Sequence, residues 1–580
     1  MLASIWQHIT KRRRKQFYFL LFLMILSSIT EVISIGAVLP FLAVLSAPEQ
    51  VFYHPLMQSF IYTLESKYGL TTITEPNEII LPVTLIFIAA ILLSTSIRLV
   101  LLYVGTRLAH STGADFSIKT YYHTLYQDYS IHIARNSSEV INGIIVKTGA
   151  AVGIIQSSLT LMSSLILTIG IMSALLAIDR NVAIIAAVCF SIFYLIVVYF
   201  TKKQIKKNGQ TIADNSTLMV KSLQEGLGGI RDILIDSSQL FYTRIYQNAD
   251  LPLRRAISNN IFMQNSPRFI MEALGMSVIA GIAFVMIQKE GGAEATIPVL
   301  GALALGAQRL LPALQQSYLA YSNINALKAS FNDLLDILEQ PLPSYINKPR
   351  PVPIKFQQEI QLKNMSFSYS ENAPWVLKDV NLRIAKGQRI GVIGVTGSGK
   401  STLLDITMGL LFPSNGEILI DGDVITAENR RAWQAHIAHV PQNIFLSDSS
   451  IEENIAFGIP KDEINSQQVK KAAKQAQISE LIEGWSDGYQ SFVGERGIKL
   501  SGGQRQRIGI ARALYKKADV LVLDEATSAL DNETEQEVMK AIESLGRELT
   551  IIIIAHRKTT LKGCDMLIEV SKDAVKSWKT

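Results

Sequence analysis

The chain is poor in cysteine and in charge for its length. Only two cysteines, Cys189 and Cys564, occur among 580 residues, so a disulfide framework is excluded and a reducing compartment fits. Charged residues make up 18% of the sequence, below the roughly 25% that is usual for soluble domains. Hydrophobic residues reach 48%. This balance favours a membrane protein, with room for one large membrane unit and one soluble domain.

Charges are scarcest in the first 330 residues, which hold six long apolar runs. Each run is long enough to cross a bilayer as a helix, which takes about 20 residues. The first run carries one charge, Glu31, and it is too long for a signal-peptide core, so it is expected to remain as a span. The pattern predicts an all-α membrane domain with six spans, at residues 16–46, 79–108, 150–178, 181–201, 266–288 and 296–322.

The distribution of charges around these runs predicts the orientation of the domain. Five consecutive basic residues at 11–15 precede the first span, which places the N-terminus in the cytoplasm. The loop at 47–78 has four acids against one lysine and fits the outside. The stretch 202–255 is rich in Lys and Arg and falls inside. Nucleic-acid binding is the alternative for this stretch, but its cations are dispersed and flank membrane spans.

The two inside connections, 109–149 and 202–265, are polar and compatible with helix. They are predicted to extend the spans well into the cytoplasm. Within them, residues 129–139 and 228–236 are expected to form short crosswise helices, with ordinary helix turns as the alternative.

A proline-rich linker separates this region from a second domain. Five prolines crowd thirteen residues, and such a cluster marks a linker: Pro341, Pro343, Pro349, Pro351 and Pro353. Short β-branched runs then alternate with helical segments, which predicts an α/β domain with a buried, largely parallel sheet. The predicted organisation is a membrane domain with cytoplasmic extensions, a linker and an α/β domain, at 1–335, 336–356 and 357–580.

A phosphate-binding loop opens the α/β domain. Residues 394–401 fit the pattern G-x-x-x-x-G-K-[ST] between an apolar strand and a helical stretch. The glycines let backbone N–H groups approach phosphates, Lys400 reaches the β- and γ-phosphates, and the Ser401 hydroxyl ligates Mg²⁺. The predicted nucleotide-binding residues of this loop are Gly394, Gly397, Ser398, Gly399, Lys400, Ser401 and Thr402.

A second apolar strand, 520–523, ends in two acidic residues. Asp524 is expected to hold the metal, directly or through water. Glu525 stands one residue further, where a base orients the attacking water.

About a hundred residues after the phosphate loop stands Leu500-Ser501-Gly502-Gly503-Gln504. A serine hydroxyl and two glycine N–H groups at the start of a helix form an anion site. This peptide resembles the signature of ABC-type ATPases. Because the chain's own loop already cradles its nucleotide, the signature is expected to contact a nucleotide held by a second copy.

The resemblance to ABC ATPases implies roles for further residues. Tyr369 would stack on adenine, Gln442 would touch Mg²⁺ and water, and His556 would contact the γ-phosphate. Residues 528–531 match the D-loop, and residues 495–497 match the segment that contacts coupling helices in exporters. All these positions are intact, which favours a homodimer with two working ATP and Mg²⁺ sites over a heterodimer with one dead site.

Spans followed by one ATPase domain resemble half-transporters of the ABC exporter class. Charges inside spans are costly and point to cargo. Arg98, Arg268 and Arg309 fall in the cytoplasmic half of the membrane and suit an anionic head group. The alternative is structural: Arg98 and Arg268 snorkel to the interface, and Arg268 has Glu272 at i+4 as a partner.

A narrower resemblance involves residues 266–275, residues 309–312 and the outer stretch 51–68. They resemble bacterial flippases of lipid-linked oligosaccharides of the PglK type, which implies an inner-membrane protein that moves a polyprenyl-pyrophosphate glycan. A basic residue expected after Arg309 is absent, and Gln316 stands there. Residues 51–68 would form a helix on the membrane surface, or a plain loop. Other cargo stays open, namely lipid A, phospholipid, peptide or drug; an ATP-gated channel or regulator is disfavoured by the intact hydrolytic residues.

Overall fold

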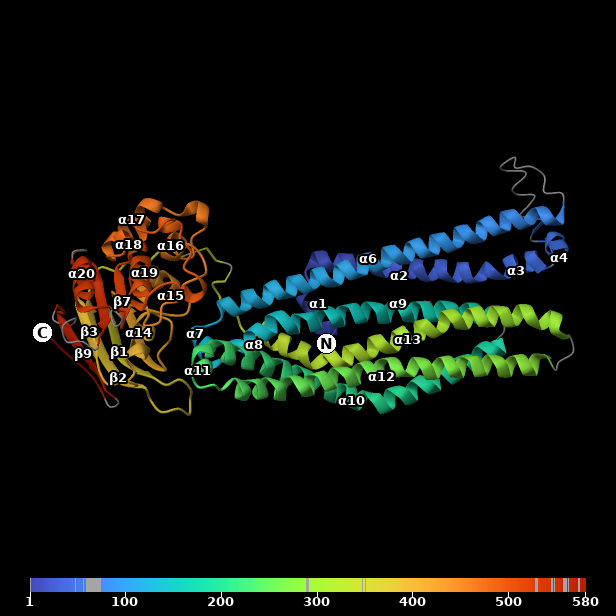
Figure 1. Cartoon of the computed structure of the whole chain (residues 1–580), viewed down its shortest axis with the longest axis horizontal. Helices are drawn as coiled ribbons and strands as arrows, with labels where there is room; N and C mark the ends of the chain where they lie inside the picture. Colours follow the sequence, from blue (N-terminus) through green and yellow to red (C-terminus); the bar gives the residue numbers. More distant parts are fainter. Residues whose placement is uncertain are drawn as a thin grey trace. The chain divides into compact units, whose positions relative to one another are not determined.

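The structure, a computed structural model, describes residues 2–46, 48–55, 57–58, 75–178, 180–287, 292–346, 348–349, 351–526, 530–543, 546, 548–555, 561, 563–571 and 574–579. The chain forms two compact units (Figure 1). The helical unit comprises Met1–Leu125 and Arg135–Pro341, and the α/β unit comprises Tyr126–Ala134 and Leu342–Thr580. The α/β unit therefore includes a short segment that lies between two predicted spans.

Four very long helices dominate the helical unit. They have 47 to 49 residues each, so at 1.5 Å per residue each is about 70 Å long, more than twice the ~30 Å hydrocarbon core of a bilayer. The predicted continuation of the spans into long helices is therefore confirmed, while the cytoplasmic side of these extensions stays a prediction. These helices are α6 (Ile80–Tyr126), α10 (Arg180–Gly228), α12 (Gln239–Ile287) and α13 (Gly292–Leu338).

Shorter helices complete the helical unit. The first predicted span divides into two helices, which end at Gly36 and Ser46. The structure describes only the first part of the outer stretch 51–68, and residues 59–68 lie outside the described residues. The remaining elements are α1 (Leu2–His8), α2 (Lys11–Gly36), α3 (Val38–Ser46), α4 (Pro48–Phe52), η1 (Pro76–Ile79), α8 (Ser137–Asn142), the π-helical turn η2 (Gly143–Lys147), α9 (Thr148–Ile178) and α11 (Ile230–Ile235).

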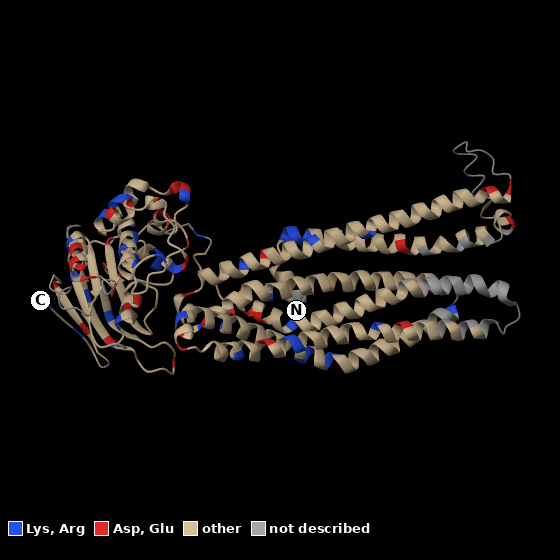
Figure 2. Ribbon diagram, in the orientation of Figure 1, with Lys and Arg blue, Asp and Glu red and all other residues tan. Residues whose placement is uncertain are grey.

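Four helical stretches among the described residues are long and apolar enough to cross a membrane: Lys11–Ser34, Pro76–Tyr126, Ser137–Leu176 and Ala187–Gly228. They contain the second predicted span and most of the third and fourth, whereas residues 35–46 of the first predicted span lie outside them. The predicted spans at 266–288 and 296–322 lie mostly in α12 and α13, where many side chains are outside the described residues. Figure 2 shows few charged residues along α6 and α9, and the large exposed side chains of α6, such as Leu92 and Leu102, are apolar.

The predicted short helices are present in the inside connections. Residues 129–139 form α7 (Tyr129–Ala134) and the start of α8, which are divided at Asn136. Asn136 has extended backbone angles, and its side chain accepts a hydrogen bond from the Ser138 amide. Asn136 therefore ends one helix and caps the next. Residues 228–236 contain α11.

The long helices lie lengthwise alongside one another (Figure 1). α9 packs on α13, and α10 packs on both α12 and α13. A cluster of fully buried side chains joins α6, α9 and α13, with Phe116, Ile154 and Phe331 at its centre. Apolar packing of this kind fixes the helices where they leave the predicted membrane region.

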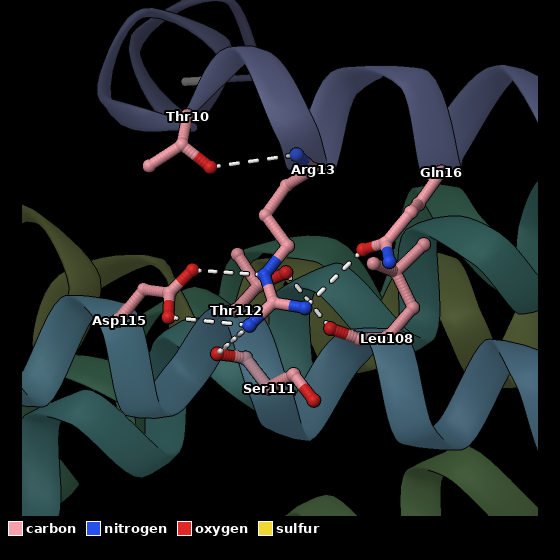
Figure 3. A network of polar contacts seen from close by, with 7 residues as sticks. All are labelled: Thr10, Arg13, Gln16, Leu108, Ser111, Thr112 and Asp115. Atoms are coloured by element: carbon pink, nitrogen blue, oxygen red, sulfur yellow. Dashed lines mark hydrogen bonds and ion pairs between the residues drawn. The ribbon is translucent and has the colours of Figure 1, made fainter.

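The basic stretch at 11–15 is anchored to α6 through Arg13 (Figure 3). The Arg13 guanidinium donates to both carboxylate oxygens of Asp115, at 2.9 and 3.3 Å. It also donates to the Gln16 side chain at 3.2 Å. Because the charge-assisted contact to Asp115 is bidentate, it holds the start of α2 in register against α6.

The α/β unit is built on a six-stranded sheet with the order β10-β9-β3-β8-β7-β6. Five of these strands are parallel, and β10 pairs antiparallel at the edge. The predicted buried, largely parallel sheet is confirmed, since all five residues of β8 are buried. The strands are β3 (Arg389–Ile393), β6 (Ile437–Val440), β7 (Val520–Asp524), β8 (Thr550–Ile554), β9 (Met566–Val570) and β10 (Val575–Lys579).

A second, antiparallel sheet with the order β2-β1-β4-β5 was not predicted from the sequence. Its strands alternate buried and exposed residues, and its buried face shares one core with β3 and α14. Its strands are β1 (Glu359–Phe367), β2 (Leu377–Ala385), β4 (Asn415–Ile420) and β5 (Asp423–Val424). The helices of the unit, besides α7, are α14 (Lys400–Thr407), α15 (Arg430–Gln434), α16 (Ile451–Ile455), α17 (Ser466–Gln475), α18 (Ser479–Glu483), α19 (Gly502–Tyr515) and α20 (Asn532–Glu543), with 3₁₀ turns η3 (Lys461–Glu463), η4 (Gly488–Gln490) and η5 (Glu495–Gly497).

Candidate functional site

The phosphate loop connects the end of β3 to the start of α14. Gly394 and Gly399 both have positive φ, at 150° and 101°. A Cβ on Gly394 would stand 2.3 Å from the Val570 carbonyl oxygen, so no side chain fits at that position. The loop thus requires glycine for its close backbone approach, and it delivers the N-terminus of α14 to any bound anion.

Lys400 lies within the curve of this loop. Its ammonium donates to the carbonyl oxygens of Gly394 and Val395, at 2.9 and 3.1 Å. The side chain is buried, and so is Ser398. A buried lysine held by its own loop is pre-positioned for a phosphate, because little side-chain freedom remains to be lost on binding.

Ser401 and Asp524, which with Gln442 are the three residues predicted to contact the metal, lie close enough for the Ser401 side chain to lower the pKa of the Asp524 carboxyl. Burial and the nearby charge of Glu525 raise the pKa of Asp524, while Ser401 and Lys400 act in the opposite direction. A carboxylate and a hydroxyl are oxygen donors that Mg²⁺ prefers, and Mg²⁺ sites of this kind use few protein ligands beside the phosphates. The donor set therefore fits a nucleotide-bound Mg²⁺.

Glu525 and Gln442 form the next part of the site. The Gln442 side-chain amide donates to the Glu525 carboxylate at 2.7 Å. Glu525 has a φ of 49°, and its amide donates to the Ile554 carbonyl at 3.0 Å. A non-glycine residue in left-handed conformation is strained, and such strain clusters at functional sites. The Glu525 carboxylate, after β7, and the Gln442 side-chain amide, after β6, therefore lie side by side.

Tyr369 lies against the helix that follows the phosphate loop. Its hydroxyl is within 2.9 Å of the Thr402 hydroxyl, and the Phe367 ring packs edge-on against its ring at 5.0 Å. The residue is 52% exposed, so part of the ring is accessible for stacking. Its role against adenine stays a prediction.

The signature residues form the N-terminus of α19. Ser501 caps the helix, since its hydroxyl accepts from the Gln504 amide at 3.2 Å and the Gln504 side chain accepts from the Ser501 amide at 2.8 Å. This capping box fixes the first turn. Gly502 and Gly503 are the first residues of the helix. The structure therefore confirms a helix start, while its contact with a second copy's nucleotide stays a prediction.

Two residues implied by the resemblance cannot be placed. His556 and Ser528 lie outside the described residues. Asp531, at the other end of the same segment, accepts hydrogen bonds from the amide and hydroxyl of Thr534 at 2.9 and 2.8 Å. In this structure Asp531 caps α20.

Sequence reasoning missed Asp405, which lies on α14 one turn after Ser401. Burial, together with the charge of Asp524, raises the pKa of Asp405 to about 6. The i, i+4 spacing from Ser401 places both residues on the same helix face, and this spacing was the available signal.

The segment 126–134, which carries α7, is held within the α/β unit by Arg430. The Arg430 guanidinium is ion-paired with Asp128 and donates to the Tyr345 hydroxyl at 2.8 Å. It also lies over the rings of Tyr345 and Phe412, at 5.3 and 5.5 Å from their centroids. Arg430 is buried. Arg430 therefore anchors residues 126–134 within the α/β unit.

Two of the cavities in the helical unit, each of about 490 Å³, share part of their lining. Residues from α2, α6, α9 and α13 line both of them: Glu31, Arg98, Leu167 and Gln316. Arg98 therefore lines both cavities, and its role in cargo binding stays a prediction. Gln316, which replaces an expected basic residue, is also in the lining.

The other two predicted cargo arginines differ from Arg98. Arg268 donates to Glu272 at 2.7 Å, and the two side chains are 54% and 50% exposed. Neither residue lines the two cavities, so the geometry favours the helix-surface pair that the sequence offered as the alternative. Arg309 lies in α13, but its side chain is outside the described residues.

Comparisons with known proteins agree with this geometry. Residues 377–528 match the family described as ABC transporter. The chain is 36% identical to an ATP-dependent lipid A-core flippase of Alkalilimnicola ehrlichii, over 45% of this chain and 44% of the flippase. It is 38% identical to the leukotoxin translocation ATP-binding protein LktB of Mannheimia glucosida, over 47% and 38%. The chain thus spans less than half the length of these relatives.

Longer but more divergent matches extend into the helical unit. A lipid A-core flippase of Cupriavidus pinatubonensis is 26% identical over 74% of this chain and 73% of its own length. The structure of a bacterial Atm1-family ABC exporter with ATP bound matches with a TM-score of 0.78 and 20% identity, over 98% of this chain and 95% of the exporter. The chain therefore combines an ABC-transporter ATPase domain with the fold of an ABC exporter.

Proposed function

We propose that the chain is an ABC exporter that couples ATP hydrolysis to movement of an anionic, lipid-linked substrate from the inner to the outer side of a bacterial inner membrane. The observation that carries the ATPase part is the hydrogen bond from Gln442 to Glu525 at 2.7 Å, next to Asp524, whose pKa is raised by burial and lowered in part by Ser401. Lys400 is buried beside them. No residue of this set departs from the pattern of a hydrolytic site.

The proposed chemistry is an in-line attack of water on the γ-phosphate. Lys400 and the amides of the phosphate loop hold the phosphates, and Ser401 and Asp524 hold Mg²⁺, which neutralises developing charge. Glu525 orients the water, and Gln442 fixes the Glu525 carboxylate. His556 is assigned to the γ-phosphate by resemblance alone. Positioning and electrostatics supply most of the rate enhancement in such a site.

The proposed assembly is a homodimer with two ATP molecules between the subunits. The signature peptide supports it, because Ser501, Gly502 and Gly503 stand at a helix N-terminus that suits a phosphate. The chain's own loop supplies the other half of each site. In this proposal, ATP binding closes the dimer, and the helical units open toward the outside.

The proposed substrate has a phosphate or pyrophosphate head group, and a polyprenyl-pyrophosphate glycan is the leading candidate. Arg98 in the cavity lining supports an anionic head group, and the PglK-type resemblance adds the glycan. The names of two relatives, lipid A-core flippases, keep lipid A as the main alternative. Phospholipid, peptide and drug cargo are further alternatives.

The test is the ATPase activity of the purified chain in nanodiscs, with candidate lipids added singly. Stimulation by a polyprenyl-pyrophosphate glycan but not by lipid A or drugs is the expected result. Stimulation by drugs alone would overturn the proposed substrate. A parallel assay of lipid movement in vesicles, with Glu525→Gln as the inactive control, separates transport from passive flipping.

A further inference from the structure

Arg98 and Glu31 form an ion pair in the lining shared by the two cavities of the helical unit described above. Arg98 Nη1 lies 3.3 and 3.4 Å from the two carboxylate oxygens of Glu31. The Ser94 hydroxyl donates to the same carboxylate at 3.2 Å. Arg98 is on α6 and Glu31 is on α2, so the pair joins the first two predicted spans.

The two partners of this ion pair differ sharply in exposure. The Glu31 side chain is 4% exposed, whereas the Arg98 side chain is 51% exposed. The carboxylate therefore lies behind the guanidinium, and the guanidinium faces the cavities. Only Nη1 of Arg98 takes part in the contact with Glu31, and a guanidinium carries five N–H donors in total. Arg98 thus has the capacity to bind a second anion from the cavity side.

The lining of the two cavities carries a balanced charge. Glu31 and Arg98 are the only ionisable residues among the described residues that line them. The other polar groups are neutral, and they include Gln156, Gln308 and Gln316. Among the described lining residues, an entering anion meets one cation and, directly behind it, one negative charge.

This arrangement has two physical consequences. An arginine without a counter-ion inside a membrane span is costly, and Glu31 offsets this cost when no cargo is present. With cargo present, Glu31 repels the anion across the guanidinium. This repulsion acts over a few ångströms in a medium of low dielectric constant. It therefore lowers the affinity for the anion by more than Glu31 raises that affinity through orienting the half-exposed Arg98 side chain.

We infer that Glu31 is the resident counter-ion of Arg98, and that it shares this guanidinium with the phosphate group of an anionic lipid. As a positioning residue, Glu31 keeps the affinity for the phosphate low enough for release. The inference deepens the proposed function and rests on it for the identity of the cargo. A site that must both load and unload needs binding that is favourable but not tight.

The experiment measures binding and turnover separately. The full chain is placed in nanodiscs of phosphatidylcholine, and the dissociation constant of geranylgeranyl pyrophosphate is measured without nucleotide, with geranylgeraniol as the uncharged comparison. Glu31→Gln is expected to tighten pyrophosphate binding about tenfold, which corresponds to about 1.4 kcal/mol, and to leave the alcohol unchanged. The stimulated turnover should fall in the same variant, so that KM and kcat decrease together.

Companion variants distinguish this role from a structural one. Glu31→Asp keeps the charge and should restore binding and turnover to near those of the parent chain. Glu31→Gln combined with Arg98→Gln should lose pyrophosphate binding. Ser94→Ala removes one hydrogen bond to the Glu31 carboxylate but keeps its charge. It should tighten pyrophosphate binding by about twofold, on the scale of one neutral hydrogen bond shared with solvent. The same variant tests the inference if Glu31→Gln does not fold.

A matched control removes another carboxylate from an arginine pair in the helical unit. Asp250 pairs with Arg254 at 3.1 Å on α12, and Arg254 is exposed. Asp250→Asn should leave the dissociation constant unchanged. Equal or weaker pyrophosphate binding by Glu31→Gln would overturn the inference, and so would the absence of pyrophosphate binding by both the parent chain and the variant. Tighter binding by Glu31→Gln with no ATPase or flipping response would instead defeat the proposed function and leave the inference standing.

Discussion

The two units build their sites in different ways. In the α/β unit, functional groups gather where parallel strands end, so that Asp524, Glu525 and Gln442 come from β7 and the loop after β6. A hydrogen bond of 2.7 Å joins Gln442 to Glu525, and Glu525 has a strained, left-handed backbone. In the helical unit, Glu31 and Arg98 stand far apart in the chain on separate long helices, beside cavities lined mainly by neutral side chains. Chemistry on a phosphate requires fixed geometry, whereas passage of a substrate requires groups that bind and let go.

The largest effect is expected in the α/β unit from Glu525→Gln. Loss of the carboxylate that orients water should lower ATP hydrolysis by roughly 100-fold or more, while ATP still binds. Steady-state hydrolysis and equilibrium nucleotide binding measure the two effects. Asp423→Asn, an exposed carboxylate on β5, is the control. Normal turnover in Glu525→Gln would show that the tight hydrogen-bonded pair is not the hydrolytic centre.

A second test concerns the rigidity of the phosphate loop. In Gly394→Ala the new Cβ would stand 2.3 Å from the Val570 carbonyl oxygen at a φ of 150°, so the unfolding free energy should fall by roughly 2–3 kcal/mol. Gly458→Ala keeps a positive φ of 81° but meets open space, so it should cost only about 1 kcal/mol. Thermal unfolding compares the two. Equal losses would mean that backbone conformation, and not close approach, selects glycine at 394.

The third prediction concerns Asp405, whose ionised carboxylate should lower the free energy of unfolding of the α/β unit. Its pKa is raised from 3.8 to about 6, so the folded state holds the proton more tightly than the unfolded state. The stability that this group contributes is therefore complete below about pH 4 and is lost as pH rises through about 6. Asp405→Asn should be more stable than the parent chain at pH 7.5, by on the order of 1–2 kcal/mol.

The measurement for Asp405 is the unfolding midpoint between pH 4.5 and 7.5. The difference between the two chains should shrink as the pH falls. A constant difference across this range would mean that the carboxyl keeps an ordinary pKa.

The smallest effect is expected on the surface of the helical unit. Glu272→Gln breaks an exposed i, i+4 pair with Arg268, and such pairs contribute about 0.3–0.5 kcal/mol. The unfolding midpoint should barely move, and the change should diminish further at high salt. A loss of several degrees would show that this pair is not a surface feature and would return Arg268 to the candidates for cargo binding.

The sequence predicted the α/β site better than the membrane cavity for a physical reason. A phosphate loop needs glycines and a lysine at fixed spacing, so the local sequence of residues 394–401 is enough to recognise it. Glu31 and Arg98 lie on different helices, and their pairing depends on how these helices pack, which no local pattern encodes. The antiparallel sheet was missed because its pairings join segments that lie far apart in the chain, such as β1 with β4, and no local pattern encodes such a pairing.

The sequence also did not predict that α7 belongs to the α/β unit. Residues 129–139 suggested a helix, but the partner of Asp128 is Arg430, about 300 residues later in the chain. Only the folded arrangement relates two such distant positions. Local propensity predicts that a helix forms, whereas its attachment is a tertiary property.

The attachment of residues 126–134 has a practical consequence for work on the isolated ATPase domain. A shortened chain that begins at Leu342 would contain Arg430 and Tyr345 but not Asp128. Its buried guanidinium would lose its carboxylate partner. Rates and melting points measured on such a fragment would describe an incomplete domain. A peptide of residues 126–134 supplied in trans is the missing piece that would make the fragment a fair substitute.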